Sequence, residues 1–454
     1  MTSVNRRTLV CLFSLLGTSA LAQDLPVAPF HLNAGYAQDS FFLRSDDDNF
    51  VLIPSGRLQM DFLGYQGAGN AKEPFNSFFP RRARLETFGT LMKHFDFQLG
   101  AEFTSAAAPL ATDDYININY TPYANVEIGQ FDAPFTMENR TSDKYTDMQE
   151  RSVAVRGFAF PENKAVGGMI WGQPVAKWAY WSLGLFNGEG QNGFTHHSNS
   201  FETMGRAWVA PFGLASFKPL SNVWVGGSFL AGNVGWSNTS QLDHLSFSDT
   251  GRFIFFTPTF TAPTPAGGAA LPANNVHMGA FGAQTKWALE LNAPVGPVVL
   301  KSEYIHVDEN TRELDTAAKS AVVRKGNLNG DAFYVRASFF VFGDPLINGL
   351  GGTQLPPHLI GDLRPNKTGD ALQLVAEFDH INFDYLASDL ATTASDGLVG
   401  NYGLDVLGVG ANYWLTKRVR LTSNFLYNIY SGRTAHPLAG SNSYEITGRV
   451  ALAL

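Results

Sequence analysis

The chain has 454 residues, of which 16% are charged and 13% are aromatic, and its formal net charge is −8 at pH 7. Mean hydropathy is −0.07, yet no apolar run of about twenty residues, the length that crosses a bilayer as a helix, follows residue 22. These values exclude a helical membrane protein, and the acidic balance gives no reason to expect a nucleic-acid partner.

The first 22 residues are predicted to form a secretory signal peptide. A short basic stretch ends at Arg7, residues 8–16 are apolar, and residues 20–22 read Ala-Leu-Ala, a cleavage-site pattern. The only cysteine, Cys11, lies inside this segment. The mature chain should therefore have neither disulfides nor thiolate metal sites.

From residue 50 onward, apolar and polar residues alternate in segments of about ten residues. In the segment 94–103, HFDFQLGAEF, the residues Phe95, Phe97 and Leu99 face one way, and Asp96 and Gln98 face the other. A strand of about 9–11 residues crosses a bilayer at the usual tilt, with one face toward lipid and one toward water. A soluble β-sandwich is the alternative, but its strands rarely alternate over that length.

Sixteen such segments can be counted. They start near residues 50, 80, 94, 112, 124, 165, 176, 203, 222, 276, 296, 328, 369, 402, 418 and 441. Short and long connections alternate, which is typical of periplasmic turns and external loops. We therefore predict an all-β fold, a 16-stranded antiparallel transmembrane β-barrel over residues 50–454, preceded by a periplasmic N-terminal lead-in over residues 23–49.

Two connections are unusual. Loop 133–164 has five Lys or Arg residues and five Asp or Glu residues, so its net charge is zero. A loop of this length is usually functional, and in a water-filled barrel it can fold into the lumen and form the narrowest point. The connection 344–368 should be a periplasmic turn, but it has 25 residues.

Several segments together carry a family resemblance. They are FVLIPSGRLQMDF (50–62), FFPRRARLETFGTL (78–91), VEIGQFDAPF (126–135), Thr141-Ser142 with Glu150 to Ser152, YVRASFFVFGDP (334–345), ALQLVAEFDHINFD (371–384) and GVGANYWLTKRVRLTSNF (408–425). Over nearly all of its mature part, the sequence resembles the phosphate-selective porin O and P family. The resemblance implies a trimeric sixteen-stranded porin in which external loops three and five and one long periplasmic turn enter the pore.

Strand parity predicts which charged side chains face the lumen. An Arg or Lys on the lipid face costs about 2–4 kcal/mol at the bilayer midplane, so these residues should point inward. Guanidinium groups there can hold oxyanions through paired hydrogen bonds. The candidate pore-lining residues are Arg57, Arg82, Arg84, Arg140, Lys144, Arg151, Arg156, Arg206, Lys286, Lys301 and Arg336. Arg81 should sit at the outer rim. The alternative is that these cations pair with neighbouring carboxylates and only maintain strand register.

The predicted function is an outer-membrane porin for small hydrophilic solutes with a mild preference for anions; phosphate and polyphosphate are the candidates that the resemblance implies. The basic residues are balanced by acids, so a tight phosphate site is not expected. The alternative is an outer-membrane barrel with a non-channel role, either an enzyme or a structural barrel closed by its loops. We expect no catalytic residues, cofactor or metal site; His196-His197 and Asp46 to Asp48 lack ligand spacing. Expected partners are solutes, outer-membrane lipid and two further copies in a homotrimer.

Overall fold

The computed structural model describes residues 32–37, 40–67, 75–104, 110–159, 164–174, 178–193, 201–217, 220–234, 247–248, 254–256, 259–260, 276–315, 321–342, 371–388, 400–416, 418–432 and 442–453. Within these ranges, no helix is long and apolar enough to cross a membrane.

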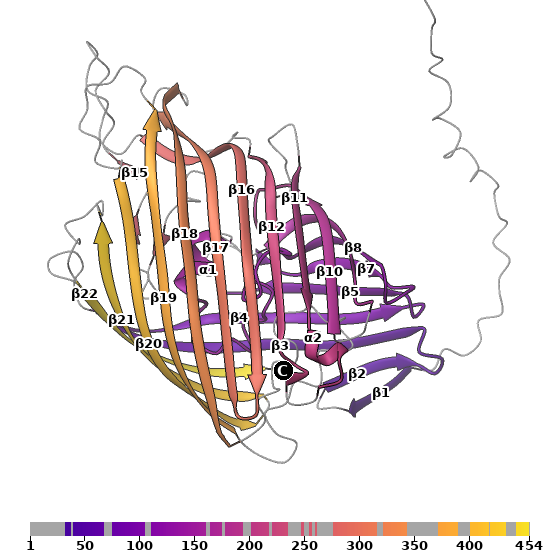
Figure 1. Cartoon of the computed structure of the whole chain (residues 1–454). Coiled ribbons are helices and arrows are strands. Elements are labelled where there is room, and N and C mark those ends of the chain that lie inside the picture. The colour runs from indigo at the N-terminus through magenta and orange to yellow at the C-terminus, as the bar shows by residue number, and fades with distance from the viewer. Residues whose placement is uncertain are drawn as a thin grey trace, which may run out of the picture.

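Sixteen antiparallel strands form a closed barrel (Figure 1). They are β3 (Phe50–Gln66), β4 (Phe75–Leu91), β5 (Phe95–Glu102), β7 (Asp114–Ile118), β8 (Asn125–Asp132), β9 (Lys164–Gly172), β10 (Ala179–Phe186), β11 (Glu202–Val209), β12 (Trp224–Val234), β16 (Val276–Val295), β17 (Val298–Asp315), β18 (Ala321–Phe342), β19 (Ala371–Ser388), β20 (Gly400–Thr416), β21 (Val419–Gly432) and β22 (Asn442–Ala453). Each pairs with the next, and β22 pairs with β3 to close the ring. The predicted fold class is confirmed. The predicted strand starts lie within about three residues of the observed ones, except that β4 begins at Phe75 and β18 at Ala321, earlier than the predicted starts near residues 80 and 328.

The described part of the chain also contains shorter strands and two short helices beside the sixteen barrel strands. They are β1 (Leu32–Ala37), β2 (Ser40–Ser45), β6 (Leu110–Ala111), β13 (Phe247–Ser248), β14 (Ile254–Phe256), β15 (Thr259–Phe260) and the helices α1 (Val153–Phe158) and α2 (Pro211–Leu214). β6 extends the pairing of β5, and β15 extends that of β16. α2 caps the short turn between β11 and β12, with Pro211 in its first turn, where the missing N–H is not needed.

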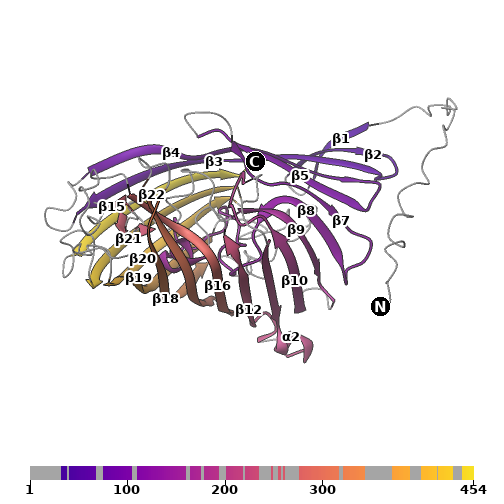
Figure 2. The same ribbon diagram turned by 90° about the horizontal axis from the view of Figure 1, so that it is seen from above.

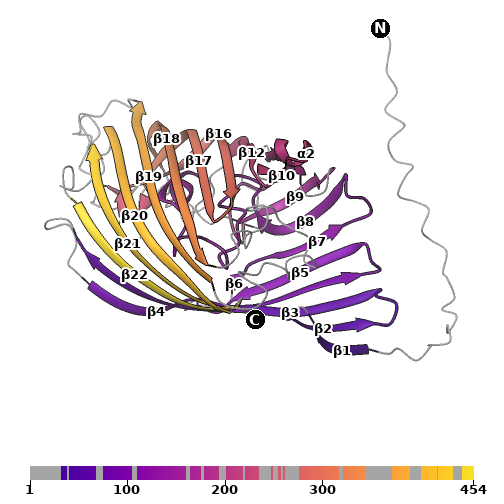
Figure 3. The ribbon, with the colours of Figure 1, turned by 60° about the horizontal axis from the view of Figure 1, so that its bottom comes forward.

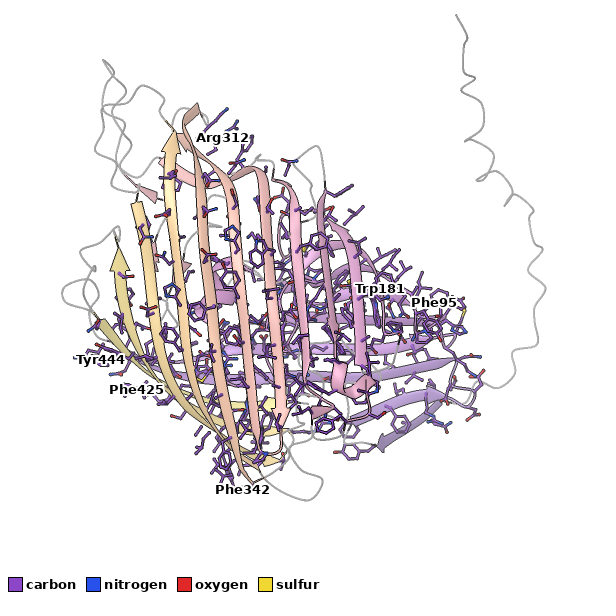
Figure 4. All side chains as sticks on the ribbon, in the orientation of Figure 1. Phe95, Trp181, Arg312, Phe342, Phe425 and Tyr444 are labelled. Carbon is purple, nitrogen blue, oxygen red and sulfur yellow. The ribbon has the colours of Figure 1, made fainter. Side chains whose placement is uncertain are left out.

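Successive side chains along each strand point alternately to the outer and the inner face of the barrel wall. Along β21 and β22, Phe425 and Tyr444 are exposed, and Figure 4 shows both of them projecting away from the barrel. Their neighbours Asn424 and Glu445 are buried on the inner side. Apolar groups on the outer face match a hydrocarbon environment, and polar groups on the inner face match a hydrated lumen.

A β-bulge in β4 changes one predicted orientation. Gln59 of β3 pairs with Arg82 and Met60 pairs with Pro80, so the register passes over Arg81. Proline has no N–H for the ladder and is tolerated at bulges, which redirect a side chain. The Arg81 Nε lies 2.8 Å from Glu150 Oε1 inside the barrel. The prediction that Arg81 sits at the outer rim is therefore wrong, because strict alternation ignores the bulge.

An N-terminal hairpin extends the sheet beyond the barrel. β1 pairs with β2, and β2 pairs with the start of β3 through Leu43 and Leu52 (Figure 3). The turn before β3 is held by Asp47, whose carboxylate accepts hydrogen bonds from the Ser45 hydroxyl at 2.7 Å and from the Asn49 amide nitrogen of the main chain at 3.0 Å. The Asp47 carboxylate therefore stabilises the turn in which it lies. No group of potential metal ligands occurs among the described residues.

Candidate functional site

Residues 133–159, here called the lumen loop, are largely buried and form hydrogen bonds with inward-facing side chains of β12, β17 and β22. Figure 2 shows these strands from above. At the start of the loop, the main-chain N–H groups of Met137 and Glu138 donate to the Glu303 carboxylate at 2.6 and 2.8 Å. The N–H of Thr136 donates to the Ser228 hydroxyl at 3.0 Å. This end of the loop is thus fixed to the inner faces of β12 and β17.

The middle of the loop is fixed to β17, β19 and β20 through Asp147. Its carboxylate lies 2.6 Å from the Lys301 ammonium and accepts a hydrogen bond from the Gln373 amide at 2.9 Å. Its main-chain oxygen accepts a hydrogen bond from Asn412 at 2.6 Å. Burial raises the pKa of Asp147, but Lys301 and Arg336 outweigh burial and lower it below its usual value.

Helix α1 ends the loop with apolar contacts. The Ser152 hydroxyl caps the helix by accepting from the Val155 N–H at 3.1 Å, a favoured residue type at this position. The fully buried Phe158 ring packs edge-on against Phe383 of β19 with ring centroids 6.2 Å apart. A Cβ on Gly330 of β18 would lie only 2.9 Å from the Phe158 ring, so glycine provides the space for it.

A dense group of charges, here called the wall cluster, joins the loop to β3, β4, β5 and β22. Its cations are Arg57, Arg81, Arg82, Arg84, Lys144, Arg151 and Arg449, and its carboxylates are Asp61, Glu86, Glu102, Asp143 and Glu150. The carboxylates come from both the wall and the loop. The loop meets Arg82 and Arg84 with its acids: Asp143 lies near both arginines, and Glu150 lies near Arg82.

Wall carboxylates hold individual cations of the cluster in place. Glu86 pairs with Arg57 of the adjacent strand and with Lys144 of the loop, whose Nζ is 3.1 Å from Glu86 Oε2. Glu102 accepts a hydrogen bond from the Arg84 Nε at 2.8 Å. Such charge-assisted contacts are among the stronger hydrogen bonds in proteins. Carboxylates of the barrel wall, as well as those of the loop, therefore hold the wall arginines in position.

Glu150 connects the loop to both sides of the barrel seam. It lies 2.8 Å from Arg81 Nε and 2.9 Å from Arg449 Nη2. Burial raises the pKa of the Glu150 carboxyl, but the charges of Arg81, Arg82 and Arg449 outweigh burial and hold it well below its usual range. The carboxylate therefore stays ionised over the physiological pH range and keeps the loop attached to this wall.

The other predicted pore-lining residues lie outside the wall cluster, in separate parts of the barrel. On the β17–β18 wall, Lys301 contacts Asp147, and the Arg336 Nη1 lies 2.5 Å from Glu138. Both acids belong to the lumen loop, so this second attachment again joins wall cations to loop carboxylates.

Two predicted cations lie away from the loop. Arg206 on β11 is fully buried and its guanidinium Nη2 is 2.7 Å from Glu290 of β16. Lys286 on β16 is 2.5 Å from Glu309 of β17. Both are inward, as parity predicts, and both pair with acids on other strands.

Two predicted cations belong to the loop itself. Arg140 is buried and donates to the main-chain oxygen of Asp132. Arg156, in the last turn of α1, donates from Nε to the Arg151 main-chain oxygen at 3.1 Å. These contacts give both residues a role in shaping the loop.

Sequence reasoning overlooked some members of the wall cluster. The candidate set held only cations, and so left out Asp143 and Glu150, which organise the cluster. Arg449 was also left out, although parity on the last strand places it inward. His196-His197 and the long turn 344–368 lie outside the described residues, as does most of the connection 235–275.

Comparison with known proteins gives a family match over one segment and a fold. Residues 54–228 match the model of the family "Phosphate-selective porin O and P". A search of curated proteins found no match. A loop L8 deletion mutant of OmpT, an outer membrane protein of Vibrio cholerae, aligns with a TM-score of 0.51 and 10% identity over 89% of this chain and 100% of that chain.

Two further solved structures are similar. The outer membrane channel DcaP of Acinetobacter baumannii aligns with a TM-score of 0.51 and 9% identity over 90% of this chain and 99% of that chain. The trimer form of Vibrio cholerae OmpT aligns with a TM-score of 0.50 and 10% identity over 89% and 100%. At these identities the likeness shows the fold alone. The match over residues 54–228 confirms the resemblance to the phosphate-selective porin O and P family, and together with the closed barrel that contains this segment it shows a porin channel of the outer membrane.

Proposed function

We propose that this porin passes small hydrophilic solutes with a mild preference for anions, and that the wall cluster sets this preference. The observation that carries the proposal is the cluster's charge balance, seven cations against five carboxylates. A positive wall inside a narrow, low-dielectric passage raises the local concentration of anions.

The exposed part of the cluster supports this assignment. The side chains of Arg81 and Arg84 remain 31% and 14% exposed, whereas Arg206 on β11 is fully buried against Glu290. Solutes in the lumen would therefore meet the cations of β4 more readily than those of β11. Selectivity should follow the accessible charges, since buried ion pairs are already neutralised.

The preference should be mild because the guanidinium groups are already engaged. Arg57 pairs with Glu86, Arg84 with Glu102, and Arg449 with Asp61. A free phosphate would have to displace carboxylates that are covalently part of the protein. We therefore propose a diffusion channel without a tight phosphate site.

We also propose that the channel works as a homotrimer and has no enzymatic role. Trimer assembly is suggested by the family resemblance and by the trimer form of the structurally similar Vibrio cholerae protein. Native mass measurement in mild detergent should give three times the monomer mass; monomer alone would count against the assembly.

The proposed channel function is tested by recording from the purified protein in planar bilayers under a potassium chloride gradient. An anion-preferring channel shifts the reversal potential toward the chloride equilibrium potential. A shift toward the potassium potential would overturn the preference, and an absence of conductance would indicate a structural barrel closed by its loops.

A further inference from the structure

The geometry points to Asp143 as a tethered counter-anion: we propose that its carboxylate occupies an oxyanion site built by four arginines, and so keeps phosphate-like solutes from binding there. The inference rests on the proposed anion preference and names the residue that limits it. It also assigns to a loop carboxylate a role in specificity that the wall cations alone would not predict.

Four guanidinium groups surround this one side chain. The distances from the Asp143 carboxylate are 2.8 Å to Arg151 Nη1, 2.9 Å to Arg82 Nε, 3.4 Å to Arg84 Nη1 and 3.6 Å to Arg57 Nη1. Asp143 is buried, with 5% of its surface exposed. A single negative charge thus lies at the focus of four positive ones.

The wall arginines have reason to require an anion at this point. Arg57 and Arg84 are direct cross-strand partners in the β3–β4 register, and like charges in such positions repel. Arg82, two residues from Arg84, adds a third positive charge on the same inward face. Asp143 enters between them from the loop and offsets that repulsion.

The fit between the carboxylate and its donors is incomplete. The Nε atoms of Arg57 and Arg82 are buried, yet neither donates a well-aligned hydrogen bond to any residue that the structure describes. Within the same described part of the chain, Asp143 Oδ1 accepts none either. Asp143 is therefore held by charge and proximity, and its two coplanar oxygens cannot align with four guanidinium planes. A tetrahedral oxyanion offers four oxygens in different directions, which suits such a set of donors better.

The arginines would stay in place without Asp143, because each has another partner. Arg82 donates from Nη1 to the Gln59 side chain at 2.9 Å, and Arg84 donates to Glu102 at 2.8 Å. Arg57 is paired with Glu86.

Arg151 is likewise held independently. It donates from Nε to the Glu138 main-chain oxygen at 3.0 Å and from Nη2 to that of Thr141 at 2.9 Å. Removing the Asp143 side chain should therefore leave a preorganised site with space where the carboxylate was. Binding to a preorganised site avoids the cost of ordering its donors.

The test compares Asp143→Ser with Glu309→Gln, which removes an identical charge from the inner wall, away from the lumen loop, and leaves the four arginines around Asp143 intact. Inorganic phosphate is the probe, added at constant ionic strength to channels that carry chloride current. The half-blocking phosphate concentration should fall about tenfold or more in Asp143→Ser, the effect of at least one charge-assisted hydrogen bond. It should stay near the parent value in Glu309→Gln. Equal changes in both variants would overturn the proposal, because net charge alone would then explain them.

A second readout separates this inference from the channel function. Phosphate should raise the thermal unfolding midpoint of purified full-length Asp143→Ser more than that of the parent or of Glu309→Gln. This result does not require conductance, so it decides the inference even if the parent fails to conduct or prefers cations. If Asp143→Ser folds poorly, phosphate should restore folding of that variant and of Asp143→Asn. Failure of phosphate to restore or stabilise either one would contradict a preorganised oxyanion site.

Discussion

Arg449 of the last strand and Asp61 of the first barrel strand face each other across the seam that closes the barrel. The Arg449 Nε and Nη2 donate to the two Asp61 oxygens at 2.7 and 2.8 Å, and both side chains are almost fully buried. The two residues are also register partners in the β3–β22 ladder. A bidentate ion pair thus lies at the seam where the first and the last strands of the barrel pair with each other.

Removing one partner of this pair should destabilise the barrel strongly. Asp61→Asn leaves Arg449 with less compensating charge in a buried position, and breaking such a pair typically costs about 3–5 kcal/mol. The thermal midpoint of the folded barrel, read by its shift in electrophoretic mobility, should fall clearly. The matched control is Asp48→Asn, which breaks the exposed pair with Arg44 and should leave the midpoint nearly unchanged. Similar midpoints for both variants would show that the seam pair contributes little.

The apolar contact of α1 should hold the lumen loop in place. Phe158→Ala removes a fully buried ring that packs against Phe383, a type of change that typically costs about 3–5 kcal/mol in a packed core. Because α1 is one attachment of the loop, loss of the Phe158 contact should loosen the loop. The single-channel conductance and the current fluctuations should then rise, while the barrel stays folded. Phe425→Ala on the outer face is the control and should leave conductance unaltered. Unchanged conductance in Phe158→Ala would indicate that the polar attachments suffice.

The ion pairs of the loop should persist far into the acidic range. Burial raises the pKa of Asp143, but Arg82, Arg151 and Arg84 outweigh it and lower the pKa well below its ordinary value of 3.8. A carboxylate with a depressed pKa in the folded state stabilises the fold above its unfolded pKa and loses this effect as the pH falls through the folded value. The stability difference between the parent and Asp143→Ser should therefore stay constant from pH 7 to about 4 and shrink only below that. A difference that already shrinks between about pH 6 and 5 would contradict the strong arginine contacts.

The local sequence was sufficient to predict the barrel, because the alternation of apolar and polar residues along each strand shows which side chains face the lipid. It placed Arg57, Arg82 and Arg336 inward, where the structure has them. It misplaced Arg81, since the bulge at Pro80 depends on pairing with β3 and leaves no mark in the alternation.

Contacts between distant parts of the chain could not be derived in this way. Asp143 lies 86 residues from Arg57 in the sequence and its contacts depend on how the loop crosses the lumen. The loop's equal numbers of acids and bases gave its net charge correctly, but not the attachment of its acids to the wall cations. The β1–β2 hairpin was also missed, because it is stabilised by pairing with β3 rather than by a strong pattern of its own.

The central claim is that accessible arginines on the β4 wall set the ionic preference of the channel. The most direct measurement is the reversal potential of Arg81→Gln/Arg84→Gln in a potassium chloride gradient, beside the parent and Lys325→Gln, which removes a cation from an exposed position on β18. The double variant should fold as a barrel and show a lower permeability for anions relative to cations, whereas Lys325→Gln should match the parent. A reversal potential that is identical in all three proteins would contradict this claim and show that Arg81 and Arg84 serve only the structure of the barrel.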